Sequence, residues 1–117
     1  MEYGLYYQHH KIATIVQDSG DFLTCFGSYR LESFPNDDRL TLVRNYIEYS
    51  VRVWPLIEAD EFHDNEEALA EEEAFIDLIE SGDWSLVNNQ TQESSPILIP
   101  VFCTDNEVNW RWNVLHR

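Results

Sequence analysis

Basic residues are scarce in this chain. Its 117 residues include 7 lysines and arginines against 22 aspartates and glutamates, which gives a formal net charge of −15, and Lys11 is the only lysine. Nucleic acids and anionic membrane surfaces are both polyanions, so they are electrostatically unfavourable partners for such a chain. The composition therefore argues against direct binding to nucleic acid or to a membrane.

Long apolar runs and a signal peptide are also missing. The longest apolar stretch, Ile97 to Phe102, is six residues long and contains Pro100, whereas a membrane-spanning helix needs about 20 apolar residues. The first residues lack the basic start and the apolar middle of a signal peptide. We therefore expect a cytoplasmic protein. Cys25 and Cys103 lie in separate apolar runs and are expected to be buried thiols.

Motifs for catalysis or for binding a cofactor or metal are not found. The 4 glycines are too dispersed for a phosphate-binding loop, and the chain has no Gly-x-Ser-x-Gly sequence. His63 and Glu67 are four residues apart but lack the second histidine of a zinc motif. We expect no catalytic residues, no cofactor and no metal site. A hydrolase that uses two of the many carboxylates remains an alternative.

The length and a hydrophobic content of 44% fit one domain over residues 1–117. Aromatic and β-branched residues predict strands over 3–8, 11–17 and 22–31. Asn36 or Asp37 is expected to cap a helix that ends or kinks at Pro55. Its buried face is predicted to contain Leu40, Val43, Ile47, Val51 and Trp54.

A second helix is expected to begin at Asp64 or Asn65 and to end at Gly82. Strands are predicted over 84–88, 96–103 and 108–114, the last from its alternation of apolar and polar residues. The predicted fold is α+β: a largely antiparallel sheet of five to six strands, with strands at both ends of the chain, packed by two central helices.

The acidic residues are concentrated in one half of the chain. Residues 53–110 contain 15 acids and no lysine or arginine, and twelve of these acids lie between Glu58 and Asp83. Carboxylates four residues apart, such as Glu67 and Glu71, destabilise a helix when no cation offsets them. The acids could serve solubility alone or a basic partner. We favour the partner, because solubility does not require that cations be absent.

The C-terminal third contains the segments Ser81-Gly82-Asp83-Trp84-Ser85-Leu86-Val87, residues 96–102 and Asn106-Glu107-Val108-Asn109-Trp110-Arg111-Trp112-Asn113. They are similar to a strand pattern of small bacterial domains, some of which are encoded beside toxins. The whole chain resembles a small acidic immunity protein of the polymorphic and contact-dependent toxin systems. The resemblance implies a non-catalytic binding protein that neutralises a basic, nuclease-like toxin by covering its functional site with an acidic surface.

The candidate partner-binding residues follow from this resemblance. They are the acids expected to enter the basic groove of the partner, with two tyrosines as apolar anchors: Asp60, Glu61, Asp64, Glu67, Glu71, Asp77, Tyr46 and Tyr49. Two alternatives remain open. One is a DNA mimic from a phage or plasmid that inhibits a defence enzyme, and the other is an accessory domain whose acidity only serves solubility. Nothing in the sequence indicates a homo-oligomer.

Overall fold

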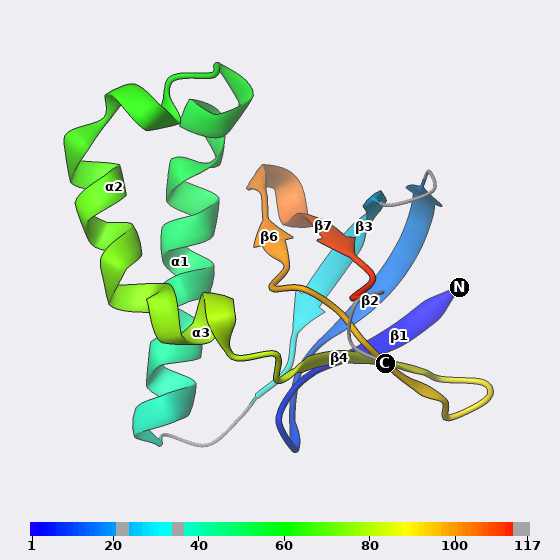
Figure 1. The fold of residues 1–117 in the computed structure, drawn as a ribbon. Helices are drawn as coiled ribbons and strands as arrows, with labels where there is room; N and C mark the ends of the chain where they lie inside the picture. Colours follow the sequence, from blue (N-terminus) through cyan, green and yellow to red (C-terminus); the bar gives the residue numbers. More distant parts are fainter. Residues whose placement is uncertain (21–23, 34–36, 114–117) are drawn as a thin grey trace.

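Strands at both ends of the chain form one sheet, and the middle of the chain is helical (Figure 1). The structure is a computed structural model that describes residues 1–20, 24–33 and 37–113. The strands are β1 (Glu2–Tyr7), β2 (His10–Gly20), β3 (Thr24–Leu31), β4 (Trp84–Asn88), β5 (Ser94–Pro96), β6 (Val101–Phe102) and β7 (Glu107–Arg111). The helices are α1 (Asp38–Glu58), α2 (Glu66–Glu72) and α3 (Ile76–Glu80), with 3₁₀ turns η1 (Phe62–Asp64), η2 (Glu73–Phe75) and η3 (Thr104–Asn106).

The α+β class and the antiparallel pairing are confirmed, but the number of strands is not. The sheet has seven strands in the order β5-β4-β1-β2-β3-β7-β6, rather than five to six. The additional strand is β5, which shares only Pro96 with the strand predicted over 96–103, and that predicted strand is shortened to β6. Pro100 directly precedes β6 and has no N–H group to donate to a ladder, which favours a short strand at the edge of the sheet, where β6 lies.

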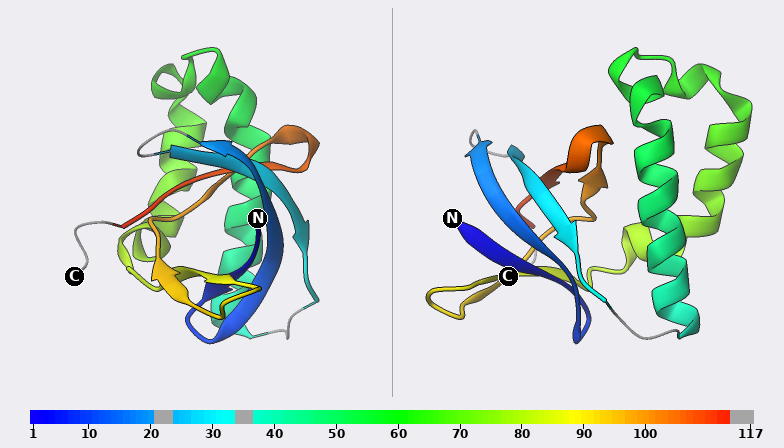
Figure 2. Two further views of the ribbon diagram at one scale, coloured as in Figure 1. Left: turned by 90° about the vertical axis from the view of Figure 1, so that its right-hand side faces the viewer. Right: turned by 180° about the vertical axis from the view of Figure 1, so that it is seen from behind.

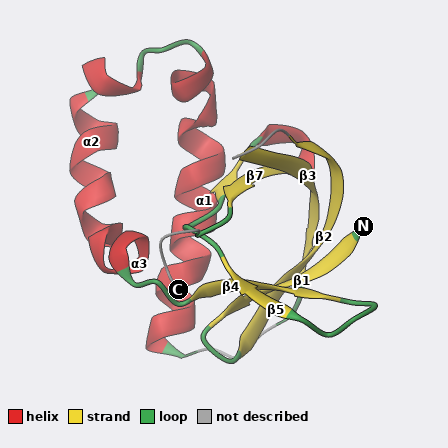
Figure 3. Ribbon diagram, turned by 45° about the vertical axis from the view of Figure 1, so that its right-hand side comes forward, coloured by secondary structure: helices red, strands yellow, loops and turns green. Residues whose placement is uncertain are grey.

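The sheet curls into a barrel (Figures 2 and 3). Ile97, which follows β5, forms an antiparallel bridge with Trp112, which follows β7. The backbone N–H of Leu98 donates to the carbonyl of Arg111 at 3.0 Å in the same region. The chain thereby joins the β5 side of the sheet to its β7 side. Such closure pairs backbone groups that would otherwise be unpaired at a sheet edge.

Large side chains fill the barrel and the space beneath α1. Leu5, Trp84, Val108 and Trp110 are each at most 2% exposed. The strands β2 and β3 approach closely at Gly27, where a Cβ atom would collide with the backbone of Val16. This close approach requires glycine in an otherwise regular strand.

α1 buries a broader surface than the sequence predicted. Val51 and Trp54 were expected on its buried face, but both are only half-buried. Tyr46, Ser50 and Val53 are buried instead, together with the predicted residues nearer the start of the helix. The reason is that α1 lies between the barrel and α2, so it is covered from two directions (Figure 1).

The start of α1 was predicted correctly, and of the two outcomes predicted at Pro55, an end or a kink, the end is wrong. Asp37 is the N-cap, and its side chain accepts hydrogen bonds from the N–H groups of Arg39 and Leu40; Asn36 lies outside the described residues. Pro55 does not end the helix, which continues to Glu58. A proline this close to the C-terminus interrupts little of the remaining hydrogen-bond ladder, so the last turn is retained.

The second helical segment begins as predicted but is not continuous. Asn65 is the N-cap of α2, and Gly82 follows α3 with a φ of +69°. Between them the helix is broken by η2. Phe75, at the end of η2, is buried against the rings of Tyr46 and Tyr49 at centroid distances of 5.6 and 5.1 Å. The helix is thus broken where Phe75 packs against residues of α1 that are distant in sequence.

Several remaining expectations concern single residues. Cys25 and Cys103 are buried thiols, as predicted, and no disulfide joins them. β7 ends at Arg111, so the strand predicted to reach Val114 is shorter; Phe22 and Val114 lie outside the described residues. No described helix is both long enough and apolar enough to cross a membrane.

Candidate functional site

The twelve acids between Glu58 and Asp83 lie in the helical part of the fold, from the last residue of α1 to the residue before β4, and α2 lies on the far side of α1 from the barrel (Figures 1 and 2). We call residues 58–83 the acidic layer; it comprises the end of α1, the connection to α2, α2 itself, η2, α3 and the residues that follow. Glu71 and Glu72 are half-buried, and the other ten acids of this layer are exposed. The charge segregation along the sequence is therefore also a segregation in space.

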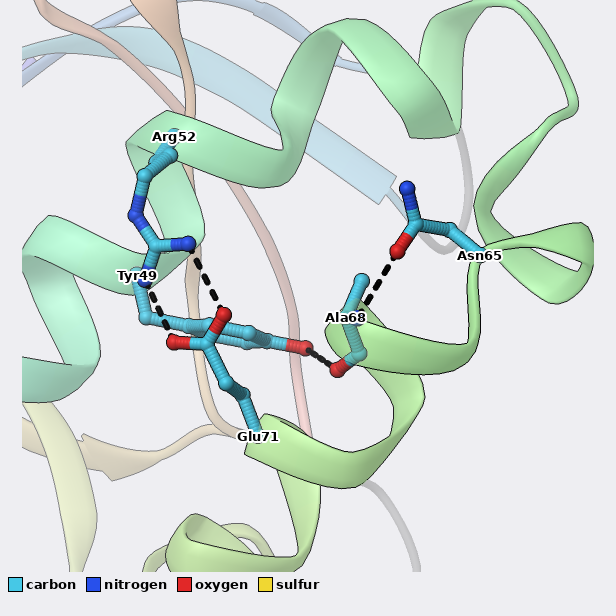
Figure 4. Close-up of polar contacts among 5 residues, drawn as sticks. All are labelled: Tyr49, Arg52, Asn65, Ala68 and Glu71. Atoms are coloured by element: carbon cyan, nitrogen blue, oxygen red, sulfur yellow. Dashed lines mark hydrogen bonds and ion pairs between the residues drawn. The ribbon is translucent and has the colours of Figure 1, made fainter.

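Tyr49 and Arg52 hold the acidic layer against α1, and Asn65 caps α2 within the layer (Figure 4). The side chain of Asn65 accepts a hydrogen bond from Ala68 N at 2.9 Å, which caps α2. The hydroxyl of Tyr49 donates to the Ala68 carbonyl at 2.9 Å. The guanidinium of Arg52 makes two hydrogen bonds to the Glu71 carboxylate, at 2.9 and 2.6 Å. Two residues of α1 thus fix the first two turns of α2.

α1 is in turn fixed to the barrel by buried hydrogen bonds. The hydroxyl of Ser50 donates to the carbonyl of Phe102 at 2.9 Å and accepts from the N–H of the same residue at 2.8 Å. The hydroxyl of Tyr46 donates to the Pro100 carbonyl at 2.8 Å. The acidic layer is consequently held in a defined position relative to the barrel, although it does not belong to the sheet.

The structure contradicts the role predicted for the two tyrosines. Tyr46 is 6% exposed and Tyr49 is 4% exposed, and both hydroxyls are used within the chain. Burial, with a smaller contribution from Glu72, raises the pKa of Tyr49 to about 12. Burial also raises the pKa of Tyr46 well above its ordinary value. These residues are therefore internal supports of the acidic layer and not anchors for a partner.

Five of the six candidate acids are exposed in the acidic layer. Asp60, Glu61 and Asp64 lie in the connection between α1 and α2, Glu67 lies in the first turn of α2, and Asp77 lies in α3. Asp60 adopts a left-handed conformation with a φ of +57°, and the next N–H, that of Glu61, donates to Leu56 O at 2.8 Å. This arrangement closes the end of α1 and turns the chain toward α2.

Glu71 differs from the other candidates because it has a cation. The residues near Glu71 in sequence include no cation, and we therefore expected its charge to be uncompensated. That expectation is wrong, because Arg52 pairs with Glu71. Arg52 lies nineteen residues away from Glu71 in sequence. It lies on α1 about one turn after Tyr49, which also contacts α2. Hydrogen bonding from Arg52 lowers the pKa of Glu71. No local sequence signal identifies this pair, since it depends on how the two helices pack.

Sequence reasoning also missed Glu72. This residue lines a cavity of about 210 Å³ between α1, the acidic layer and the segment that connects β5 to β6. Most of the lining is apolar, including Val53, Ile57, Ile79 and Ile99. Among the residues that the structure describes, no hydrogen-bond donor and no cation contacts the Glu72 carboxylate. Glu72 is half-buried and is the acidic residue of this lining.

A larger cavity of about 570 Å³ lies beside the start of α1 and is lined by residues that include Gln8, His10, Asp37 and Asp38. The carboxylate of Asp37 is already used as the helix cap. Over the described ranges, no group of three or more His, Cys, Asp or Glu side chains is placed to hold a metal ion. Neither observation adds support for the hydrolase alternative.

No protein-family model, no curated protein and no solved structure matches the chain. The functional interpretation therefore depends on the acidic layer.

Proposed function

We propose that this chain is a non-catalytic inhibitor protein, of the immunity-protein kind, that binds a basic protein such as a nuclease toxin. The acidic layer would cover the functional site of the partner and compete with its polyanionic substrate. The observation that supports this proposal is the placement of ten exposed carboxylate residues in one layer of the fold. Solubility would be served equally well by acids mixed with bases over all surfaces.

The physical advantage of such a layer is the rate of association. Complementary fields raise association rate constants to about 10⁸–10⁹ M⁻¹s⁻¹ at low salt, and the effect falls steeply as ionic strength rises. The layer is also held in place by the Tyr49 and Arg52 contacts. A preorganised surface loses less entropy when it binds. An inhibitor that must act before its target cleaves nucleic acid benefits from both properties.

The test compares two variants with the same loss of charge. One neutralises the acidic layer by Glu67→Gln, Glu73→Gln and Asp77→Asn. The other neutralises exposed acids elsewhere by Glu93→Gln, Asp105→Asn and Glu107→Gln. Immobilised wild type and both variants are incubated with extract of the native host at low salt, and retained proteins are identified by mass spectrometry. We expect a basic protein that the wild type and the second variant retain and the first variant loses.

Each other result contradicts the proposal. Equal loss with both variants would mean that only net charge matters, and equal retention with both would mean that the layer serves solubility. The identity of the retained protein distinguishes a toxin inhibitor from a DNA mimic. A toxin inhibited in a nuclease assay by the added chain supports the proposal, whereas a restriction or defence enzyme would indicate a DNA mimic instead.

A further inference from the structure

The cavity of about 210 Å³ between α1, the acidic layer and the β5–β6 connection has the size of one large side chain. Pockets for drug-sized molecules usually measure about 300–1,000 Å³, whereas an engineered cavity of about 150 Å³ with an aliphatic and aromatic lining holds benzene. Ile57, in the lining, is 40% exposed. Four more apolar lining residues are only half-buried: Phe62, Ile79, Ile99 and Val101. The lining therefore reaches the surface of the molecule.

The chemistry of the lining favours an apolar occupant. Besides Val53 and the five apolar residues that reach the surface, the lining contains three hydroxyls, on Tyr46, Tyr49 and Ser50. All three already hydrogen-bond to backbone groups of the chain. Apart from Glu72, the lining thus offers an occupant no polar side chain that is free. A polar group would leave water without regaining its hydrogen bonds, and a water molecule would lack the several polar partners that it needs.

The surroundings of the cavity are negatively charged. Four lining residues are next in sequence to exposed acids, which are Glu58, Glu61, Glu73 and Glu80. Residues 53–110 contain no lysine or arginine. Arg52 packs on the ring of Tyr49, but its charge is offset by Glu71. An apolar ligand that is itself an anion, such as a fatty acid, would be repelled here, whereas an apolar group with cations beside it would be attracted.

We propose that this cavity receives one large apolar side chain of the partner, such as phenylalanine or leucine, from a segment in which lysine or arginine flanks that residue. This inference rests on the proposed function, since it takes the partner to be basic, and it adds the location of an anchor. Interface hot spots are typically side chains that fill a desolvated pocket, surrounded by contacts that exclude water. The exposed acids would speed association, and the apolar side chain would slow dissociation.

The proposal is testable without the partner by short peptides that differ in one property each. Acetyl-Lys-Phe-Lys-amide and acetyl-Lys-Leu-Lys-amide carry the anchor between two cations. Acetyl-Lys-Ala-Lys-amide lacks the anchor, and acetyl-Glu-Phe-Glu-amide reverses the charge. The intact chain, labelled at its methyl groups, is titrated with each peptide and followed by NMR. We expect at least one of the two anchored cationic peptides to shift the methyl resonances of Val53, Ile57 and Ile79 saturably, with a dissociation constant on the order of 1 mM.

The other two peptides should bind about fivefold more weakly or worse. Equal binding of the alanine peptide would mean that only charge attracts the ligand. Equal binding of the glutamate peptide would overturn the requirement for flanking cations. If neither anchored cationic peptide shifts these methyl resonances, the cavity is not an anchor site.

Two matched variants test the apolar wall. Ile57→Gln should weaken binding of the tighter anchored peptide about threefold or more. Ile76→Gln changes a comparably exposed isoleucine of the acidic layer that is not part of the lining, and it should leave binding nearly unchanged. Both positions are exposed, so neither change removes a buried side chain. Equal effects of the two substitutions would overturn the proposal.

A second matched pair tests the surrounding charge. Glu58→Gln with Glu61→Gln neutralises two acids next to the lining and should weaken binding of the same peptide about threefold. Asp18→Asn with Glu93→Gln removes the same charge from exposed positions outside the acidic layer, and it should have a smaller effect. Equal weakening by the two double variants would mean that net charge, rather than the acids beside the cavity, attracts the cationic segment, and would overturn this part of the proposal.

The two proposals fail in distinguishable ways. If the host extract contains a partner that depends on Glu67, Glu73 and Asp77 while neither anchored peptide shifts the cavity methyls, the inhibitor function stands and the cavity inference is wrong. If an anchored peptide enters the cavity but no basic protein is retained from the extract, the proposed function is wrong. If both hold, Ile57→Gln should accelerate dissociation of the captured partner more than Ile76→Gln does, and equal dissociation rates would mean that the partner does not use the cavity.

Discussion

Ser50 shows how much can depend on one small side chain. Its hydroxyl both donates to and accepts from the backbone of Phe102, so it satisfies two polar groups in a buried contact between α1 and β6. Tyr49 satisfies one carbonyl at the contact between α1 and α2. Buried polar groups that lose their partner carry a desolvation penalty that an exposed group does not. The two residues therefore differ in how much stability they contribute.

We predict that Ser50→Ala lowers the free energy of unfolding by about 2–3 kcal/mol, because two backbone groups of Phe102 lose their partner. Tyr49→Phe leaves only the Ala68 carbonyl without its additional donor and should cost about 1 kcal/mol. Urea denaturation followed by tryptophan fluorescence measures both. Ser33→Ala, at an exposed position, serves as the control and should change stability by less than about 0.5 kcal/mol. A smaller loss for Ser50→Ala than for Tyr49→Phe would contradict this explanation.

Alkaline pH should destabilise the fold through the same buried groups. Burial raises the pKa of Tyr49 to about 12 and that of Cys103 to about 11. A pKa raised in the folded state favours the protonated form there, so its contribution is complete below the unfolded pKa and is lost as pH rises through the folded pKa. We predict that the free energy of unfolding falls by roughly 2–4 kcal/mol as pH rises from about 9 to about 11, and that it falls further toward about pH 12.

Urea denaturation at a series of pH values tests the alkaline effect. Tyr49→Phe should reduce the slope of unfolding free energy against pH above about pH 10, which is the ordinary pKa of a tyrosine. Stability that stays constant over this range, or an unchanged slope in the variant, would mean that these groups are more accessible to solvent than their burial implies.

At the scale of elements, the packing of α2 against α1 depends on a small residue. Ala68 is 3% exposed, and its backbone takes part in both the Asn65 cap and the Tyr49 contact. Its methyl group allows the two helices to approach closely enough for Arg52 to reach Glu71. A larger side chain at this position would have no space without moving the acidic layer.

We predict that Ala68→Leu lowers the free energy of unfolding by about 1–3 kcal/mol, which is typical of overpacking a well-filled site. Ala70→Leu in the same helix changes intrinsic helix propensity equally, but Ala70 is exposed, and its effect should stay within about 0.5 kcal/mol. Thermal denaturation of the two variants provides the comparison. Similar losses in both would indicate that α2 is not closely packed at Ala68.

Element boundaries show what local sequence can predict. Asp37 was one of two predicted caps, with Asn36, and Asn65 was one of two residues predicted to begin the second helix, with Asp64. Both starts were located because capping is local: one side chain accepts hydrogen bonds from N–H groups two or three residues later. The break at η2 and the shortening of the strand predicted over 96–103 to Val101–Phe102 were not predicted. Both segments contact residues that are distant in sequence. The ring of Phe75 packs against Tyr46, and the hydroxyl of Tyr46 donates a hydrogen bond to the Pro100 carbonyl.

At the scale of the whole molecule, the concentration of carboxylates opposes folding. Like charges four residues apart cost a few tenths of a kcal/mol each, and Glu73 and Asp77 are both exposed in the acidic layer. Salt shortens the range of this repulsion, since the Debye length falls from about 30 Å at 0.01 M to about 3 Å at 1 M. Stability should therefore depend on ionic strength.

We predict that the free energy of unfolding rises on the order of 1 kcal/mol between about 0.01 M and about 0.5 M NaCl. The variant Glu67→Gln, Glu73→Gln, Asp77→Asn should show a smaller rise. The variant Glu93→Gln, Asp105→Asn, Glu107→Gln, with the same net charge, should respond more like the wild type. Chemical denaturation in urea, which adds no ions, measures the effect. Identical salt dependence in the three proteins would contradict repulsion localised in the acidic layer.

The sequence by itself determined the α+β class, the largely antiparallel pairing, the starts of the two helical segments to within one residue, and the location of the charge along the chain. These properties follow from alternation, from local hydrogen bonds and from composition. Only the tertiary structure decided that the sheet closes between Ile97 and Trp112, that Tyr46 and Tyr49 are internal, and that Arg52 pairs with Glu71. Each of these is a contact between residues far apart in sequence, and its formation depends on how whole elements pack.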